Sequence, residues 1–138
     1  MTAVEILDYN LIVVCVCVYR SPDGDFSIFL RTLESVIQKV QVRKRRLILC
    51  GDWNINFMHE SRRLCDVQEL LSLHNLVNTV RSPTRVTKDT ASLIDVVITD
   101  KESISDIATV IDLGYSDHKA LVLQLTVNKM VKKWKVIT

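Results

Sequence analysis

The feature that most constrains the fold is an uninterrupted apolar run at residues 11–18, rich in β-branched valine. Such a run predicts a strand buried on both faces, as in sheets covered by helices or by another sheet. It is far shorter than the roughly 20 apolar residues that span a bilayer, so no membrane partner is expected. The turn sequence Ser-Pro-Asp-Gly at residues 21–24 ends the strand.

A helix and a second strand follow this turn. Asp25 suits a helix N-cap, and the apolar residues after it recur with helical spacing, at Phe26, Phe29, Leu30, Leu33, Ile37 and Val40. The cations at residues 43–46 suit a helix C-terminus, and residues 47–50 predict a short strand. This β-α-β order predicts an α/β fold with a mixed or parallel sheet.

The remaining elements are predicted from the same periodicities. A second amphipathic helix contains Leu64, Val67, Leu70, Leu71 and His74 and ends near Asn75. Residues 76–80 are short and extended, residues 82–91 form a polar loop, and strands are expected at 93–99, 107–111 and 119–127.

Length and composition indicate one globular domain. The chain has 138 residues, of which 48% are hydrophobic and 25% charged, which excludes a disordered or fibrous chain. We assign residues 1–128 to the domain and 129–138 to a basic tail. A formal net charge of +2 is too small to indicate a nucleic-acid partner by itself. The N-terminus lacks a secretory signal pattern, so an intracellular location is expected.

The cysteines do not form a recognisable metal motif. They stand at positions 15, 17, 50 and 65, without CxxC spacing or a paired histidine. The sequence therefore indicates neither a zinc site nor a disulfide framework. Cys15 and Cys17 fall on one face of the first predicted strand, where burial as free thiols is expected.

Polar residues cluster where the predicted strands end, which is where α/β proteins place functional groups. The candidates are Tyr19, Asp52, Asn54, Asp95, Asp117 and His118. In the segment Gly-Asp-Trp-Asn at residues 51–54, Asp52 and Asn54 have two interpretations. They belong either to a turn that bonds its own backbone or to a site for a hard cation such as Mg²⁺.

His118 follows Asp117 directly and precedes a strand. Asp95 is a candidate to fix the orientation and tautomer of the His118 ring, provided that their strands are neighbours. An imidazole held in this way can stabilise the charge that develops on a phosphoryl oxygen. His59 and His74 lack such a context and are predicted to be structural.

The order of these motifs resembles the C-terminal portion of the endonuclease/exonuclease/phosphatase superfamily, which has the DNase I-like fold. The resemblance runs through a strand ending in Tyr19-Arg20, then Gly51-Asp52-x-Asn54, Ser92-x-Ile94-Asp95 and Ser116-Asp117-His118. Ser82-Pro83-Thr84-Arg85 adds a likeness to endonuclease domains of non-LTR retrotransposons. The resemblance implies part of a four-layer α/β sandwich whose N-terminal strands are missing here.

The resemblance also implies a role for each candidate residue. Asp52 would activate or position the attacking water, and Asn54 would contact the phosphate or the metal. His118, oriented by Asp95, would stabilise the transition state. Asp117 would bind the metal or support one of its ligands, and Tyr19 would contact the scissile phosphate. The implied cofactor is Mg²⁺, with Mn²⁺ as an alternative, and the implied substrate is DNA, which extends the expected location to the nucleus.

The sequence departs from the family in one respect that bears on activity. The family's domain begins earlier, with strands that carry an Asn and a Glu, and this Glu is the principal Mg²⁺ ligand. Neither has a counterpart here. We therefore expect a truncated domain with weak or absent turnover, and whether the chain is an active enzyme stays open. The loss of covering strands would also leave residues 11–18 exposed and promote self-association.

Two other functions remain open from the sequence. The first is nucleic-acid binding without catalysis, through the cations at 43–46, Arg62, Arg63, Arg81, Arg85 and the lysines at 129, 132, 133 and 135. These cations also fit a basic helix end and a solvated tail. The second is a phosphoesterase acting on small-molecule or lipid phosphates, because fold alone does not determine the substrate.

Overall fold

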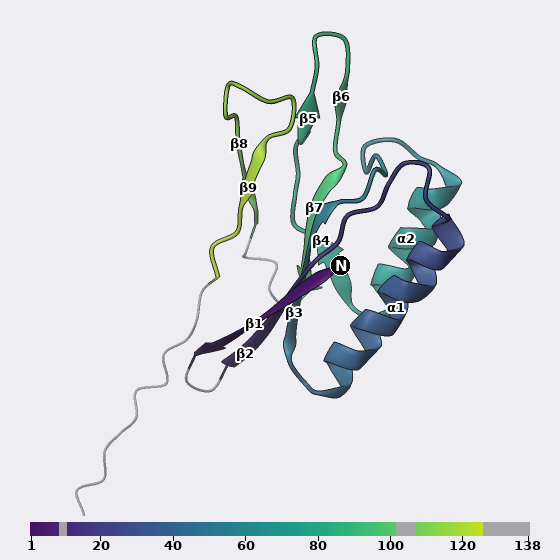
Figure 1. Cartoon of the computed structure of the whole chain (residues 1–138), viewed down its shortest axis with the longest axis vertical. Coiled ribbons are helices and arrows are strands. Elements are labelled where there is room, and N and C mark those ends of the chain that lie inside the picture. The colour runs from purple at the N-terminus through teal and green to yellow at the C-terminus, as the bar shows by residue number, and fades with distance from the viewer. Residues whose placement is uncertain (9–10, 102–106, 126–138) are drawn as a thin grey trace, which may run out of the picture.

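The computed structural model describes residues 1–8, 11–101 and 107–125. Its main element is a five-stranded mixed sheet with the order β1-β2-β3-β7-β4 (Figure 1). The strands are β1 (Thr2–Asp8), β2 (Leu11–Cys17), β3 (Arg46–Asp52), β7 (Asp95–Asp100) and β4 (Leu76–Asn78). Strands β2 and β3 are parallel and the other neighbouring pairs are antiparallel. The predicted α/β class and mixed sheet are confirmed.

Helix α1 (Phe26–Val42) connects the two parallel strands, as the apolar spacing predicts. The Asp25 side chain accepts a hydrogen bond from the backbone N–H of Ile28 at 3.0 Å and caps the helix. Phe29, Leu33 and Ile37 lie on the buried face. This β2-α1-β3 unit brings the C-terminal ends of two strands to the same edge of the sheet.

Helix α2 (Arg62–Leu73) also agrees with its predicted range. Ser61 caps it by accepting a hydrogen bond from the Leu64 N–H at 3.1 Å. The chain then turns at Asn75, whose φ of 57° is left-handed and ends the helix. The chain continues directly into β4.

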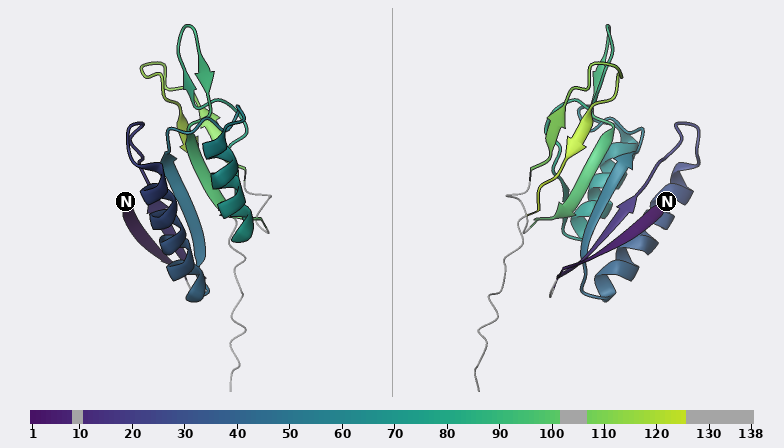
Figure 2. Two further views of the ribbon diagram at one scale, coloured as in Figure 1. Left: turned by 90° about the vertical axis from the view of Figure 1, so that its right-hand side faces the viewer. Right: turned by 60° about the vertical axis from the view of Figure 1, so that its left-hand side comes forward.

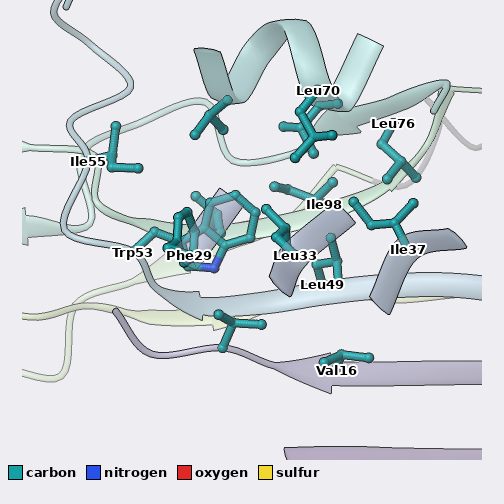
Figure 3. Close-up of a cluster of buried hydrophobic side chains, with 14 of the residues drawn as sticks. Val16, Phe29, Leu33, Ile37, Leu49, Trp53, Ile55, Leu70, Leu76 and Ile98 are labelled. Atoms are coloured by element: carbon teal, nitrogen blue, oxygen red, sulfur yellow. The ribbon is translucent and has the colours of Figure 1, made fainter. Parts of the chain in front are cut away.

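Two apolar clusters separate three layers (Figure 2). Between the helices and the main sheet lies a core that includes Phe29, Leu33, Leu49, Trp53 and Ile98 (Figure 3). On the opposite face, Val13, Ile48 and Val97 pack towards a small antiparallel sheet of β8 (Thr109–Ile111) and β9 (Ala120–Val122). A helical layer, a large sheet and a second sheet are consistent with the expected part of a DNase I-like sandwich.

The structure corrects the expectation that residues 11–18 are exposed. Strand β2 lies between β1 and β3, and Val13, Val16 and Val18 are buried. The strand with exposed apolar side chains is β1, which the sequence analysis did not predict. Its side chains at residues 1–7 are all exposed, so no buried face imposes a recognisable alternation on the sequence.

The predicted loop at residues 82–91 contains a short hairpin, formed by β5 (Arg85–Val86) and β6 (Ala91–Ser92). Thr87 and Thr90 close its end, with the Thr87 N–H donating to the Thr90 carbonyl at 2.8 Å. Its polar, mostly exposed residues give no strand pattern. The basic tail at 129–138 lies outside the described residues. Among the helices of the described residues, none is long and apolar enough to cross a membrane.

Candidate functional site

Two carboxylates meet at one edge of the main sheet because of the strand register. Asp52 is the last residue of β3, Asp95 is the first residue of β7, and the two are direct partners in the antiparallel ladder. His118 reaches the same edge from the segment before β9 and forms an isolated bridge with Arg85. One ligand atom each from Asp52, Asp95 and His118 lies within 4.8 Å of the others. The structure thus assembles three of the predicted site residues.

Asp95 orients His118 as the sequence predicts. The His118 Nδ1 atom lies 3.0 Å from Asp95 Oδ2 and 3.3 Å from Asp95 Oδ1. The His118 backbone N–H donates to the Ser116 hydroxyl at 3.1 Å, which fixes the main chain beside the ring. Since a carboxylate accepts the Nδ1 proton, Nε2 is the ring nitrogen left for a substrate or an ion.

Asp52 is held by a tight turn that follows β3. Its Oδ1 accepts a hydrogen bond from the Asn54 N–H at 2.9 Å, and Asn54 has a left-handed φ of 50°. The turn starts at Gly51, with a φ of 129°, where an added Cβ would lie 2.1 Å from the Val18 carbonyl oxygen. Only glycine fits there. The backbone-bonded turn is therefore present, and it positions the Asp52 carboxylate.

Arg20 connects this turn to the end of β2. Its buried guanidinium donates to the Trp53 carbonyl from Nε at 2.8 Å and to the Asn54 carbonyl at 3.0 Å. In return, the Asn54 side-chain Nδ2 donates to the Arg20 carbonyl at 2.7 Å. Asn54 thus supports the site through its backbone and its amide nitrogen. In the sequence, Arg20 follows Tyr19 at a strand end, and nothing there indicates this role.

Thr84 is a second residue whose importance the sequence analysis missed. Its fully buried hydroxyl oxygen accepts hydrogen bonds from the N–H groups of Ile94 at 3.2 Å and Asp95 at 3.0 Å. Its carbonyl accepts from the Lys119 N–H at 2.7 Å. Thr84 therefore joins the strand of Asp95 to the segment of His118. In the sequence, the only signal for Thr84 is its position in the Ser-Pro-Thr-Arg motif. A threonine in a polar loop is usually exposed, so its complete burial could not be expected from the sequence.

Two other candidates lie outside the group formed by Asp52, Asp95 and His118. Asp117 is exposed and pairs with Arg85 across 2.9 Å, and this hydrogen bond holds the pKa of the Asp117 carboxyl below its ordinary value. Its carboxylate is not part of the group formed by Asp52, Asp95 and His118. Tyr19, just beyond β2, is 68% exposed and makes its ring available to a ligand in solution.

The electrostatics of Asp52 differ from those of an exposed carboxyl. Its partial burial raises its pKa above the ordinary value, and the nearby Asp95 carboxylate acts in the same direction. The Asn54 N–H and the His118 ring oppose this shift. Two carboxylates in close contact repel each other, and a divalent cation relieves such repulsion. Carboxylate oxygens are donors that suit Mg²⁺ and Mn²⁺, whereas an imidazole nitrogen suits a transition metal such as Mn²⁺ better than Mg²⁺.

A family model described as endonuclease-reverse transcriptase matches residues 13–122, which include all the predicted site residues. The chain belongs to this endonuclease-reverse transcriptase family. Membership confirms the resemblance to the endonuclease/exonuclease/phosphatase superfamily inferred from the motifs. No curated protein sequence matches the chain significantly.

Solved structures with the same fold include the endonuclease domain of TRAS1, a telomere-specific non-LTR retrotransposon, with a TM-score of 0.76 and 24% identity. The match covers 88% of this chain and 59% of that one. A 3′-5′ exonuclease from Neisseria meningitidis has a TM-score of 0.63 and 17% identity, covering 88% of this chain and 64% of its own. An endonuclease/exonuclease/phosphatase family protein from Leptotrichia buccalis has the same TM-score at 15% identity, with 89% and 53% covered. This chain therefore spans between 53% and 64% of the length of these structures.

Proposed function

We propose that the chain carries the hydrolytic site of a metal-dependent DNA endonuclease. The observation that supports this most directly is the group of Asp52, Asp95 and His118, in which His118 donates to Asp95 across 3.0 Å. A water-activating carboxylate beside an oriented imidazole suits phosphodiester hydrolysis. Membership of the endonuclease-reverse transcriptase family supports the same chemistry.

Each residue has a proposed role. Asp52 orients the attacking water and accepts its proton, which its raised pKa favours. In its imidazolium form His118 donates from Nε2 to the phosphoryl oxygen on which negative charge develops, while Asp95 accepts from Nδ1, orients the ring and stabilises its positive charge. Tyr19 contacts the scissile phosphate from its exposed position.

Asp52 and Asn54 are the proposed ligands of a Mg²⁺ or Mn²⁺ ion. A bound ion of this kind supplies charge neutralisation at the phosphate and lowers the pKa of a coordinated water. Asp117 was predicted as a ligand or as the support of one, and its pairing with Arg85 favours the supporting role. Among the described residues, the group of Asp52, Asp95 and His118 contains only two carboxylates. One of them, Asp95, already accepts a hydrogen bond from His118. We therefore propose weak activity for this chain alone.

DNA is the proposed substrate because a cation lies beside the site and exposed aromatic rings stand on the segments that lead to it. Arg85 lies near Asp52, Tyr19 is exposed just before Arg20, whose N–H donates to the Asp52 carbonyl, and Tyr115 is exposed on the segment that leads to His118. Cations bind the phosphate backbone and aromatic rings stack on bases. The structural similarity to a retrotransposon endonuclease domain points in the same direction. A nuclear location is proposed on the same ground.

The same cations favour a second candidate, DNA binding without catalysis. The two candidates are distinguished by plasmid nicking and DNA binding measured together on wild type, Asp52→Asn and a control. Glu69→Gln is a matched control because it removes one charge on the exposed side of α2. Nicking that is lost only in Asp52→Asn supports the endonuclease. Salt-dependent binding without nicking in any of the three proteins would support the binding module instead.

A further inference from the structure

A groove lies between the C-terminal part of α1 and the outer strand β1, on the helix side of the main sheet. Figure 2 shows β1 beside this helix, at the outer edge of the sheet. Glu5 of β1 is the register partner of Val14 of β2, and Ala3 is the partner of Val16. These pairs share the face of the sheet that packs against α1. Ala3 and Val14 form an apolar floor, and the groove has a volume of about 270 Å³.

The groove carries more positive than negative charge. Lys39 lies in the last turn of α1 and Arg43 is the C-cap, so the two cations are about one helical turn apart, and both line the groove. Arg45 lines it as well and forms an ion pair with Glu5, the single carboxylate of the lining. Among the described residues, no carboxylate pairs with Lys39 or Arg43. Two positive charges in the groove are therefore left without a partner.

These cations are remote from the catalytic group. Arg46 begins β3 and Asp52 ends it, and Arg46 pairs with Val13, next to Val14 in the floor of the groove. Six residues of extended strand separate the two ends by about 20 Å. The cations of the groove therefore do not serve a phosphate that is bound at Asp52. The helix dipole accounts for cations at the end of α1, but not for Arg45 or for an apolar floor beneath them.

The shape of the groove favours a single strand of nucleic acid over other polyanions. A cleft with a cationic rim and an apolar floor admits one extended strand, whose sugars pack on the floor while its phosphates face the rim. A double helix or a membrane surface is too broad to enter and would contact the rim alone. Acidic peptides match the charge, but their short carboxylate side chains leave less apolar surface for the floor.

We propose that this groove binds the backbone of single-stranded nucleic acid. Lys39 and Arg43 contact neighbouring phosphates, and Ala3 and Val14 pack against the sugars. Glu5 limits the affinity, because it neutralises Arg45 and faces the same groove. The chain thereby holds a strand at a site separate from the group of Asp52, Asp95 and His118, and this binding does not depend on the proposed nuclease function.

The test is binding of a fluorescein-labelled oligodeoxythymidine to the full chain, followed by fluorescence anisotropy in a chelator over a range of salt concentrations. Lys39→Gln and Arg43→Gln should each weaken binding roughly threefold to tenfold. Each should also reduce the slope of log affinity against log salt by about 0.7, the value for one lost phosphate contact on a single strand. Arg31→Gln is the matched control, because it removes one exposed cation from α1 outside the groove and should leave affinity and slope unchanged.

A variant with the opposite expected effect separates binding from folding. Glu5→Gln frees Arg45 and should tighten binding roughly threefold, a gain that loss of the fold cannot produce. Unchanged affinity in both Lys39→Gln and Arg43→Gln, or equal weakening in Arg31→Gln, would overturn the proposal. The proposal would also fail if polyglutamate or phosphatidylserine vesicles, at equal charge, displaced the probe as well as unlabelled oligodeoxythymidine does.

Discussion

The hydroxyl oxygen of Thr84 lies 3.0 Å from the backbone nitrogen of Asp95, at the point where β7 begins. The same oxygen accepts a hydrogen bond from the preceding N–H, of Ile94. A fully buried side chain from a loop thereby determines where the Asp95 strand starts. The placement of the Asp95 carboxylate thus depends on a residue outside the main sheet.

Thr84→Val should destabilise the chain by about 1–3 kcal/mol, because it leaves the buried N–H of Ile94 and the partly buried N–H of Asp95 without their acceptor. Valine has nearly the shape of threonine, so the change isolates the hydroxyl group. Urea unfolding followed by circular dichroism measures the effect. Thr84→Ser retains the acceptor and is the control; a valine variant as stable as wild type would show that these hydrogen bonds contribute little.

Asp95→Asn should lower DNA nicking by roughly 10²–10⁴-fold if the chain is active, because the amide cannot hold the His118 ring as the carboxylate does. Single-turnover nicking of supercoiled plasmid in Mn²⁺ gives the rate. Glu69→Gln should retain the wild-type rate. Full activity of Asp95→Asn would remove Asp95 from the mechanism.

Nicking should be barely detectable in millimolar Mg²⁺ and should increase in Mn²⁺, because Mn²⁺ binds the same oxygen and nitrogen donors more tightly. Asp52→Asn should abolish the remaining activity in both metals. The measurement is plasmid relaxation over a range of concentrations of each ion. Robust nicking in Mg²⁺ would contradict the expected weak metal affinity, and equal nicking by both proteins would exclude Asp52 from the reaction.

The raised pKa of Asp52 makes a prediction about stability without divalent ions. The folded state binds a proton at the Asp52 carboxyl more tightly than the unfolded state does. The contribution of Asp52 to stability is therefore complete below the pKa that this carboxyl has in the unfolded chain. That contribution is lost as pH rises through the folded pKa. At neutral pH, Asp52→Asn should therefore melt above wild type, and the difference should vanish in acid below the ordinary pKa of aspartate.

Thermal melting of both proteins between acidic and neutral pH, in the presence of a chelator, tests this prediction. Asp23→Asn changes an exposed carboxyl and serves as the control. A lower melting temperature of Asp52→Asn at neutral pH would mean that the hydrogen bond from Asn54 outweighs the cost of burial.

Strand β1 should mediate self-association, because it is the outer strand of the main sheet and exposes Val4, Ile6 and Leu7. Sedimentation velocity should detect dimers or larger species of the wild type. Ile6→Lys should shift the chain towards monomer, since a charged edge strand opposes pairing. Leu73→Lys, at an exposed site on α2, should have no effect; a monomeric wild type would refute the prediction.

The elements with a strong local pattern were predictable from sequence. Helices α1 and α2 each combine a cap residue with an apolar stripe, and both signals lie within a few neighbouring positions. Strand β1 and the β5–β6 hairpin lack a buried face, so their strand structure comes from pairing with segments elsewhere in the chain. The local pattern of apolar and polar residues therefore cannot predict this pairing.

The amino-acid sequence by itself determined the β2-α1-β3 unit, the turn at Gly51 and the residue types placed at strand ends, because each depends on contacts between near neighbours. The tertiary structure decided which of these residues meet. The register of β3 on β7 brings Asp52 to Asp95, the Thr84 hydroxyl determines where β7 starts, and the parallel register of β2 and β3 brings Cys15 to Cys50. The contacts of Asp52 with Asp95 and of Cys15 with Cys50 join residues far apart in the chain, and their pairing follows from packing the whole sheet against its helices.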